Sequence, residues 1–226
     1  MIRRKHYVPP DFSFSVVVRY TLHCKQVAAM SSDTFIITGL GNPGEQYNGT
    51  RHNVGFAAVD ELNRLAGDGV FLKKWEAATV KVSLWGATVH LVKPLTYMNR
   101  SGRAVAGFVD FYKIKPEQLI VIHDDLDMRP GRLKLVSGGG SGGHNGIRSI
   151  VDSLGESSFF RLKIGIGRPG SGTTPAQMPV EKYVLTAFNS EEVDIITARY
   201  AEIAKGLQLL IENDPLRAMN YLNSFK

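Results

Sequence analysis

Cysteine is almost absent from this sequence, since Cys24 is the only one among 226 residues. A disulfide within the chain needs two thiols, and a cysteine-based zinc site needs several, so both are excluded. Long apolar runs are absent as well, because Phe12–Val18 is far too short to cross a bilayer. The content of 43% hydrophobic and 21% charged residues is that of an ordinary globular protein.

The formal net charge of +6 suggests an acidic partner such as nucleic acid. Residues 1–33 hold five basic and two acidic side chains, which leaves 22 basic against 19 acidic residues in 34–226. About half of the excess positive charge therefore lies in the first segment. Any anion-binding surface on the rest of the chain must be a local patch.

Residues 1–33 differ in character from the rest of the chain, being basic at the start and mildly apolar later. They fit a transit peptide, a disordered arm or a start codon placed too early. Met30 is the favoured true first residue, because a predicted strand begins at Phe35. We therefore expect residues 1–33 to be an extension and residues 34–226 to be one domain.

Hydrophobic periodicity predicts alternating strands and helices in residues 34–226. Strands are predicted at 35–38, 79–84, 88–92, 119–123, 133–136 and 160–166, and helices at 54–66, 99–113, 145–154, 191–213 and 215–223. The second and third strands form a hairpin around Trp85-Gly86. The pattern predicts a three-layer α/β domain with a mixed, twisted sheet flanked by helices, and the strand 119–123 at the sheet centre. Residues 171–179 are expected to form a surface loop.

The stretch Gly39-Leu-Gly-Asn-Pro-Gly44 matches the Gly-x-Gly-x-x-Gly pattern of dinucleotide-binding folds. In those folds the third glycine opens a helix whose N-terminus faces the pyrophosphate. Here the helical pattern starts only near Asn53, and Asp60 and Glu61 fall inside a helix instead of ending a second strand. A nucleotide-dependent oxidoreductase is therefore disfavoured.

A second glycine-rich stretch, Gly138–Gly146, precedes a predicted helix. It lacks the Gly-Lys-Ser/Thr ending of a P-loop, which argues against an ATPase. Its backbone N–H groups and the following helix N-terminus suit an anion. A glycine hinge without a ligand fits the same residues equally well.

Three histidines, His52, His123 and His144, lie beside loops at strand ends or helix starts, where sheet-based active sites gather. A lone loop histidine is most often a polar cap. As a general base, His52 needs a partner that fixes its tautomer, and Asp124 is the natural choice because it follows the strand 119–123. Asp125 or Asp127 are alternatives.

The run His123-Asp-Asp-Leu-Asp127 also suggests a metal site. In an extended strand, however, Asp124 and Asp125 point to opposite faces, and no second motif has ligand spacing. We therefore expect no metal. We also expect no serine nucleophile elbow and no cysteine nucleophile, so that a hydrolytic site would use activated water.

Asn42, Asn99 and Asn145 all lie at loop or helix-start positions, where asparagine usually caps a turn or helix. Beside His52 they could also orient an ester carbonyl, stabilise its oxyanion or grip a peptide backbone. Tyr97 and Met98 would form an apolar wall beside Asn99, or they belong to the ordinary core.

Several ordered segments together resemble the bacterial-type peptidyl-tRNA hydrolase family. Gly39-Leu-Gly-Asn-Pro-Gly-Glu-Gln-Tyr47 and Thr50-Arg-His-Asn-Val-Gly55 resemble its first signature, and Lys93-Pro-Leu-Thr-Tyr-Met-Asn-Arg-Ser-Gly102 its second. His123–Asp127, Gly138–Ile150 and Arg161-Leu-Lys-Ile-Gly-Ile-Gly-Arg-Pro-Gly170 extend the likeness. It covers about residues 35–225.

This resemblance implies cleavage of the ester between a peptide and the 3′-terminal ribose of tRNA, releasing peptide and free tRNA. His52 would be the general base that activates water, Asp124 would orient it, and Asn42 would position the carbonyl. The implied substrate-binding residues are Tyr47, Tyr97, Met98, Asn99, His144 and Asn145. The family uses no metal or organic cofactor, is usually monomeric and acts in the cytoplasm, with an organelle as the alternative if residues 1–33 are a transit segment.

A local basic patch should meet the phosphates of the tRNA acceptor stem. The candidates are Arg132, Lys134, Arg148, Arg161 and Lys163. Val136 is apolar where a basic residue often contributes in the family, which weakens Lys134 as half of a phosphate clamp. The rival hypothesis is a non-catalytic RNA-binding relative of the same fold.

Overall fold

The computed structural model describes residues 33–171 and 174–225. The predicted extension, residues 1–33, lies outside the described residues except for Asp33, and so does the predicted start at Met30. Ser32–Lys226 forms one compact unit. Within the described ranges, no helix combines the length and apolar character that crossing a bilayer requires.

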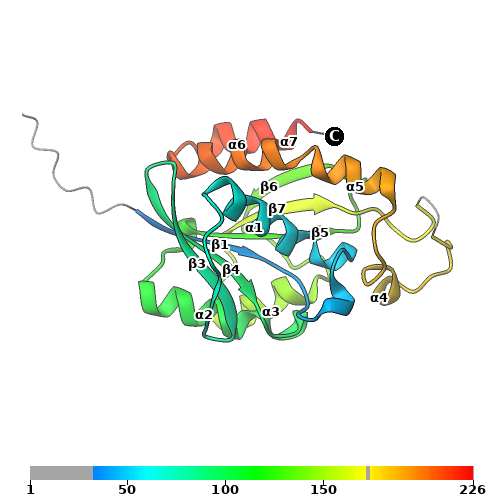
Figure 1. Cartoon of the computed structure of the whole chain (residues 1–226), viewed down its shortest axis with the longest axis horizontal. Helices are drawn as coiled ribbons and strands as arrows, with labels where there is room; N and C mark the ends of the chain where they lie inside the picture. Colours follow the sequence, from blue (N-terminus) through cyan, green and yellow to red (C-terminus); the bar gives the residue numbers. More distant parts are fainter. Residues whose placement is uncertain (1–32, 172–173, 226) are drawn as a thin grey trace, which may run out of the picture. The chain divides into compact units, whose positions relative to one another are not determined.

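Seven strands and seven α-helices make up the described fold, joined in part by short 3-10 helices (Figure 1). The strands are β1 (Thr34–Gly39), β2 (Leu72–Lys74), β3 (Ala77–Leu84), β4 (Ala87–Pro94), β5 (Leu119–Asp125), β6 (Leu133–Ser137) and β7 (Phe160–Gly165). The α-helices are α1 (Val54–Leu65), α2 (Ser101–Tyr112), α3 (Asn145–Leu154), α4 (Val180–Tyr183), α5 (Ser190–Thr197), α6 (Tyr200–Ile211) and α7 (Pro215–Asn223). The 3-10 helices are η1 (Glu45–Tyr47), η2 (Arg51–Asn53), η3 (Met98–Arg100) and η4 (Pro116–Gln118).

The strands form one mixed sheet in the order β2-β3-β4-β1-β5-β7-β6. The four consecutive strands β4, β1, β5 and β7 are parallel, whereas β2, β3 and β6 pair antiparallel with their neighbours. The expected mixed sheet is confirmed. The placing of residues 119–123 at its centre is wrong by one strand, because β1 holds the middle position and β5 lies beside it. Both strands are mostly apolar and almost entirely buried, so hydrophobicity alone could not rank them.

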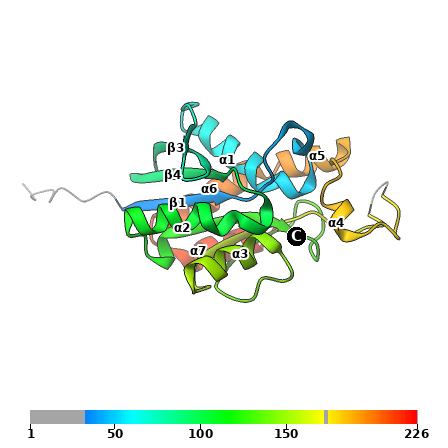
Figure 2. The ribbon, with the colours of Figure 1, turned by 90° about the horizontal axis from the view of Figure 1, so that it is seen from below.

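Helices cover both faces of the sheet, which confirms the three-layer prediction (Figures 1 and 2). Alternate strand residues divide the core into two clusters. On one face Ile37 and Ile122 pack with residues of α1, α6 and α7. On the other face Ile36 and Val121 pack with residues of α2 and α3.

Most element boundaries match the sequence pattern, and the departures have local causes. The hairpin turn at Trp85-Gly86 is present with φ angles of 51° and 79°, as a two-residue turn requires. The predicted helix 191–213 is instead two helices, α5 and α6. The break at Ala198-Arg199 accompanies a hydrogen bond from Arg199 Nε to the Gly131 carbonyl, at 3.0 Å. The short β2 and α4 were not predicted, because neither is long enough to show a period.

The strand β1 and the helix α1 touch backbone to backbone at Gly39 and Gly55. A Cβ added at Gly39 would lie 2.0 Å from the Gly55 carbonyl oxygen, and one added at Gly55 would lie 2.4 Å from the Ile122 carbonyl oxygen. No side chain fits such an approach. The contact sets where the loop between β1 and α1, which contains η2, meets the end of β5.

Substitution of Gly55 by Ala should destabilise the fold by about 1–3 kcal/mol or more, because the added methyl overlaps backbone atoms that cannot rotate away. Thermal or urea unfolding measures the change. Gly140→Ala is the matched control, since its Cβ would meet nothing within 4 Å. Equal midpoints for the two variants would show that β1 and α1 have room to separate.

Candidate active site

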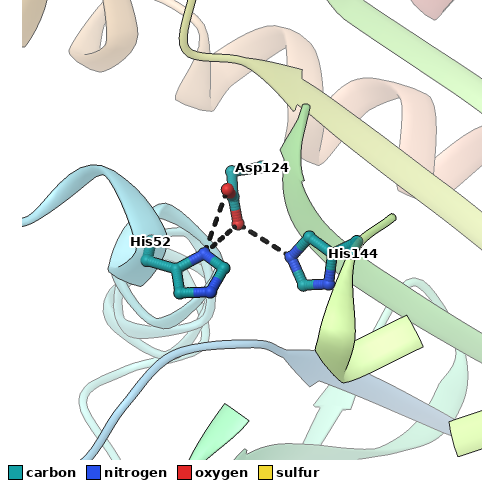
Figure 3. A group of neighbouring side chains, drawn as sticks. All are labelled: His52, Asp124 and His144. Carbon is teal, nitrogen blue, oxygen red and sulfur yellow. Dashed lines mark hydrogen bonds and ion pairs between the residues drawn. The ribbon is translucent and has the colours of Figure 1, made fainter. Parts of the chain in front are cut away.

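His52 lies on η2, in the connection between β1 and α1, and its imidazole faces Asp124 at the end of β5 (Figure 3). Nδ1 of His52 is 2.9 and 3.0 Å from the two carboxylate oxygens of Asp124. The carboxylate accepts the Nδ1 proton, which leaves the Nε2 lone pair available. The contact between His52 and Asp124 expected from the spacing is therefore present.

Asp124 is 3% exposed, and its carboxylate is enclosed by two imidazoles. Nε2 of His144 also donates to it, at 2.9 Å (Figure 3). Burial alone would raise the pKa of the Asp124 carboxyl, but His52 and His144, through charge and hydrogen bonds, hold that pKa well below its usual range. The carboxyl group therefore stays ionised throughout the pH range in which an imidazole titrates.

His144 occupies the N-cap position of α3, and this fixes which of its nitrogens carries the proton. Its Nδ1 accepts hydrogen bonds from the backbone N–H groups of Gly146 and Ile147, at 3.2 and 3.3 Å. An accepting Nδ1 leaves the proton on Nε2, which is the nitrogen that faces Asp124. The sequence placed His144 in the cleft wall but gave no sign that it shares the carboxylate with His52.

His123 is a buried neighbour of this group. Its Nδ1 donates to the carbonyl oxygen of Asp124 at 2.7 Å, and its ring centroid is 4.7 Å from that of His144. Burial, with a smaller contribution from His144, holds the pKa of His123 well below its usual range, so this imidazole is neutral. Its ring packs against that of His144, and it lines the same cleft as His52.

His52, Asp124 and His144 also have the spacing of a metal site, since one ligand atom from each lies within 4.8 Å of the others. Their orientation suits hydrogen bonds better. The nitrogen of His144 that faces the group carries a proton, so it has no lone pair for a metal. The neighbouring acids do not converge on the group, because Asp125 pairs with Lys163 and Asp127 pairs with Arg168. Asp125 and Asp127 are therefore not the partners of His52.

Ser141 has the sequence neighbours of a serine nucleophile but not the geometry of one. Gly139–Gly143 does match the letters Gly-x-Ser-x-Gly, and Ser141 lines the same cleft as His52. A nucleophile elbow, however, is a sharp turn directly between a strand and a helix. Here Ser141 lies in a longer loop between β6 and α3, and no described side chain hydrogen bonds to its hydroxyl. The serine therefore lacks a base that could activate it.

Asn42 is tied to the residue that follows His52. Its backbone N–H donates to Asn53 Oδ1 at 2.9 Å, and Asn53 Nδ2 donates back to the Asn42 carbonyl at 3.0 Å. Asn42 Oδ1 accepts the N–H of Met98 at 2.9 Å. The Nδ2 group of Asn42 is left as its donating end. Asn53 was missed in the sequence, where only its place beside His52 hinted at a role.

A cleft of about 330 Å³ opens beside His52, Asp124 and His144. Its walls include His52, Asp124, His144 and Asn145, as expected, together with Val180, Glu181 and Val184 from the α4 region. Asn99 is exposed on η3, and Tyr97 before it is 57% exposed. Tyr47, on η1, is half-buried.

Met98 was expected to line the cleft or to belong to the core, and the structure decides for the core. It is 5% exposed and packs in the cluster between the sheet, α2 and α3. It contributes to the site through its backbone N–H, which holds Asn42.

The five basic residues named as phosphate contacts differ in accessibility. Lys134 and Arg148 are exposed, and Arg132 is half-buried. Lys163 lines the cleft, where its Nζ lies 2.8 Å from Asp125 Oδ2. Arg161 is only 3% exposed, and its Nη1 donates to the Gly140 carbonyl at 2.7 Å. The structure therefore does not support Arg161 as a phosphate contact, because its guanidinium is committed to holding the glycine-rich loop.

Known proteins resemble this chain over most of its length. The family model for peptidyl-tRNA hydrolase matches residues 36–226. The peptidyl-tRNA hydrolase of Desulfotalea psychrophila is 48% identical over 197 residues, covering 87% of this chain and 100% of the relative. The one of Caldicellulosiruptor bescii is 44% identical over 189 residues, covering 84% of this chain and 96% of the relative.

Solved structures agree in fold as well as in sequence. The crystal structure of peptidyl-tRNA hydrolase from Acinetobacter baumannii is 39% identical to this chain and superposes with a TM-score of 0.79. The match covers 86% of this chain and 97% of that chain. The matched part includes every strand and helix that builds the site, and the chain therefore belongs to the peptidyl-tRNA hydrolase family.

Proposed function

We propose that this chain hydrolyses the ester between the peptide and the tRNA of a peptidyl-tRNA, with His52 as the general base. Membership of the family supports the reaction. The observation that carries the mechanism is the hydrogen bond from His52 Nδ1 to buried Asp124, because it presents the opposite nitrogen as a base.

In this mechanism His52 Nε2 takes a proton from water while the water oxygen attacks the ester carbonyl carbon. The tetrahedral intermediate then collapses, and the bond between the carbonyl carbon and the ribose oxygen breaks. The imidazolium returns its proton to the ribose oxygen, which yields free tRNA and a peptide acid. Asp124 stabilises the imidazolium, since its lowered pKa keeps it charged throughout the cycle.

His144 donates a second hydrogen bond to Asp124, beside that of His52, and thereby restricts rotation of the carboxylate (Figure 3). A carboxylate fixed by two donors keeps the His52 ring in one orientation. His144 in turn cannot turn away without losing its two bonds to the start of α3. The base is therefore aligned by the secondary structure behind it.

The three asparagines have separate proposed roles. Asn42 would donate through Nδ2 to the oxygen of the carbonyl as negative charge develops on it. Asn99 and Asn145 are exposed and would bind the peptide part, and Tyr47 and Tyr97 would add apolar surface to its binding site. Lys134, Arg148, Arg132 and Lys163 would contact acceptor-stem phosphates. A monomeric state, a cytoplasmic location and the lack of any cofactor stay predictions.

His52→Ala should lower kcat for release of peptide from an N-blocked aminoacyl-tRNA by about 100- to 10,000-fold, because water loses its base. Circular dichroism should show the fold unchanged. The activity of the unmodified chain should be the same with and without chelators. Equal rates for the two proteins would remove His52 from the mechanism, and absence of peptide release by the unmodified chain would favour the RNA-binding relative.

Asn42→Asp should lower kcat by about 100- to 1,000-fold, because it replaces an amide donor by an oxygen that repels the oxyanion. The new carboxylate can still accept the Met98 N–H, so the loop should keep its shape. Asn48→Asp is the matched control, since it adds the same charge to an exposed position nearby. A similar loss in both variants would mean that charge in this loop, and not the Asn42 donor, matters.

Lys134→Ala should raise KM for the tRNA substrate. It should also reduce the slope of log KM against log salt concentration by about 0.9, the value for one lost phosphate contact. Lys81→Ala is the control, because Lys81 is exposed on β3 toward the other edge of the sheet. If the two variants have the same KM and salt slope, Lys134 does not lie in the tRNA interface.

A further inference from the structure

Arg51, the residue before His52, has a guanidinium that is almost completely buried. The residue is 1% exposed, and it belongs to the largest fully buried side chains of the described fold. Its Nη2 donates to Glu192 Oε2 at 2.6 Å, and Glu192 is itself 5% exposed. A buried arginine is costly to desolvate, so its position calls for an explanation.

The guanidinium binds residues 186 and 187 as well as the carboxylate of Glu192. Nη1 donates to Thr186 Oγ1 at 2.5 Å and to the Ala187 carbonyl at 2.6 Å. A longer contact of 3.3 Å reaches the Thr186 carbonyl. The charged group also stacks on Tyr183 and Phe188, with Cζ at 4.6 and 5.2 Å from the ring centroids. One planar cation thus holds residues 183–192 from several sides.

The backbone around His52 pairs with the same segment. The N–H of His52 donates to the Val184 carbonyl at 2.8 Å, and the N–H of Arg51 donates to the Thr186 carbonyl at 3.0 Å. Thr50 and Ala187 form an isolated antiparallel bridge. The position of the His52 backbone is therefore set by residues 184–187, and the Arg51 side chain holds those residues in place.

The far side of this segment is fixed to the sheet and to α5. Tyr183 Oη donates to the Ile166 carbonyl, just beyond β7, at 2.7 Å. Glu192 Oε2 also accepts the N–H of Asn189, which caps α5. The ion pair between Arg51 and Glu192 thus joins η2 to the start of α5 and the segment between α4 and α5 (Figure 1).

The segment that Arg51 holds forms part of the cleft. Val180, Glu181 and Val184 line the same 330 Å³ cleft as His52. Through Arg51, this wall and the base are held in one fixed arrangement. A substrate that rests against the wall would therefore meet His52 Nε2 at a defined distance, which is what a reactive geometry needs.

We propose that Arg51 is a positioning residue, which couples the cleft wall around α4 to His52 for the hydrolytic step. The inference rests on the proposed role of His52 as base. A purely structural ion pair would be replaceable by apolar side chains of similar size without loss of activity. A positioning residue would not be, because methionine cannot donate to the Thr186 hydroxyl and the Ala187 carbonyl.

The test compares Arg51→Met, Glu192→Leu and the double variant, with kcat and KM measured on an N-blocked aminoacyl-tRNA. Each single change leaves a buried charge without its partner and should lower the Tm. The double change removes both charges and should recover most of that loss. We expect kcat of the double variant to stay reduced about tenfold or more, with KM changed by less than about threefold.

Arg51→Lys is a milder variant that keeps a charge opposite Glu192 but cannot make the planar set of contacts. It should fold and should show the same reduction in kcat, which keeps the inference testable if the apolar variants fail to fold. Leu222→Ala is the control for stability alone, since Leu222 is fully buried on α7. It should lower the Tm and leave kcat unchanged at a temperature where the variant is folded.

Wild-type kcat in Arg51→Lys or in the folded double variant would overturn the positioning role. A fall in kcat for Leu222→Ala equal to that for Arg51→Lys would overturn it as well, because loss of stability would then suffice. The proposed function fails separately, if His52→Ala is as active as the unmodified chain. If His52→Ala is inactive and Arg51→Lys is fully active, only the positioning role of Arg51 fails.

Discussion

The site depends on one buried carboxylate that accepts hydrogen bonds from two imidazoles. Asp124 lies at the end of β5, a parallel strand inside the sheet, so its position is as rigid as the core. His52 and His144 approach it from different connections, and their charge and hydrogen bonds offset the cost of burying it. The loop from β1 to α1 and the start of α3 therefore meet at a single anion.

This arrangement explains how a few polar groups can hold the His52 imidazole in one orientation. The proposed base His52 is oriented by Asp124, Asp124 is held by His144, and His144 is held by backbone N–H groups of α3. This chain of hydrogen bonds ends at backbone N–H groups of a helix and not at a flexible side chain. An ester is reactive enough that one aligned base and a few fixed dipoles suffice to hydrolyse it.

Much of this site could be predicted from the sequence, because local patterns mark strand ends and helix starts. The approach of His52 to Asp124 followed from placing both at the carboxyl edge of a parallel sheet. The second donor, His144, did not follow, since it depends on which nitrogen caps α3. Arg161 was misjudged because strand alternation gives its face but not the glycine-rich loop that covers it. Long-range contacts such as that of Arg51 with Glu192 leave no mark on local periodicity.

The close contact between Gly39 and Gly55 explains one glycine of the Gly-x-Gly-x-x-Gly pattern. Glycine at position 39 is required because a helix lies against the strand end, and not because a phosphate approaches it. Packing alone has thus helped to produce the letters Gly-x-Gly-x-x-Gly, which in other folds identify a nucleotide site. The same pattern of glycines can therefore arise from close helix packing or from close approach of a phosphate. The residue at which the next helix begins distinguishes the two cases.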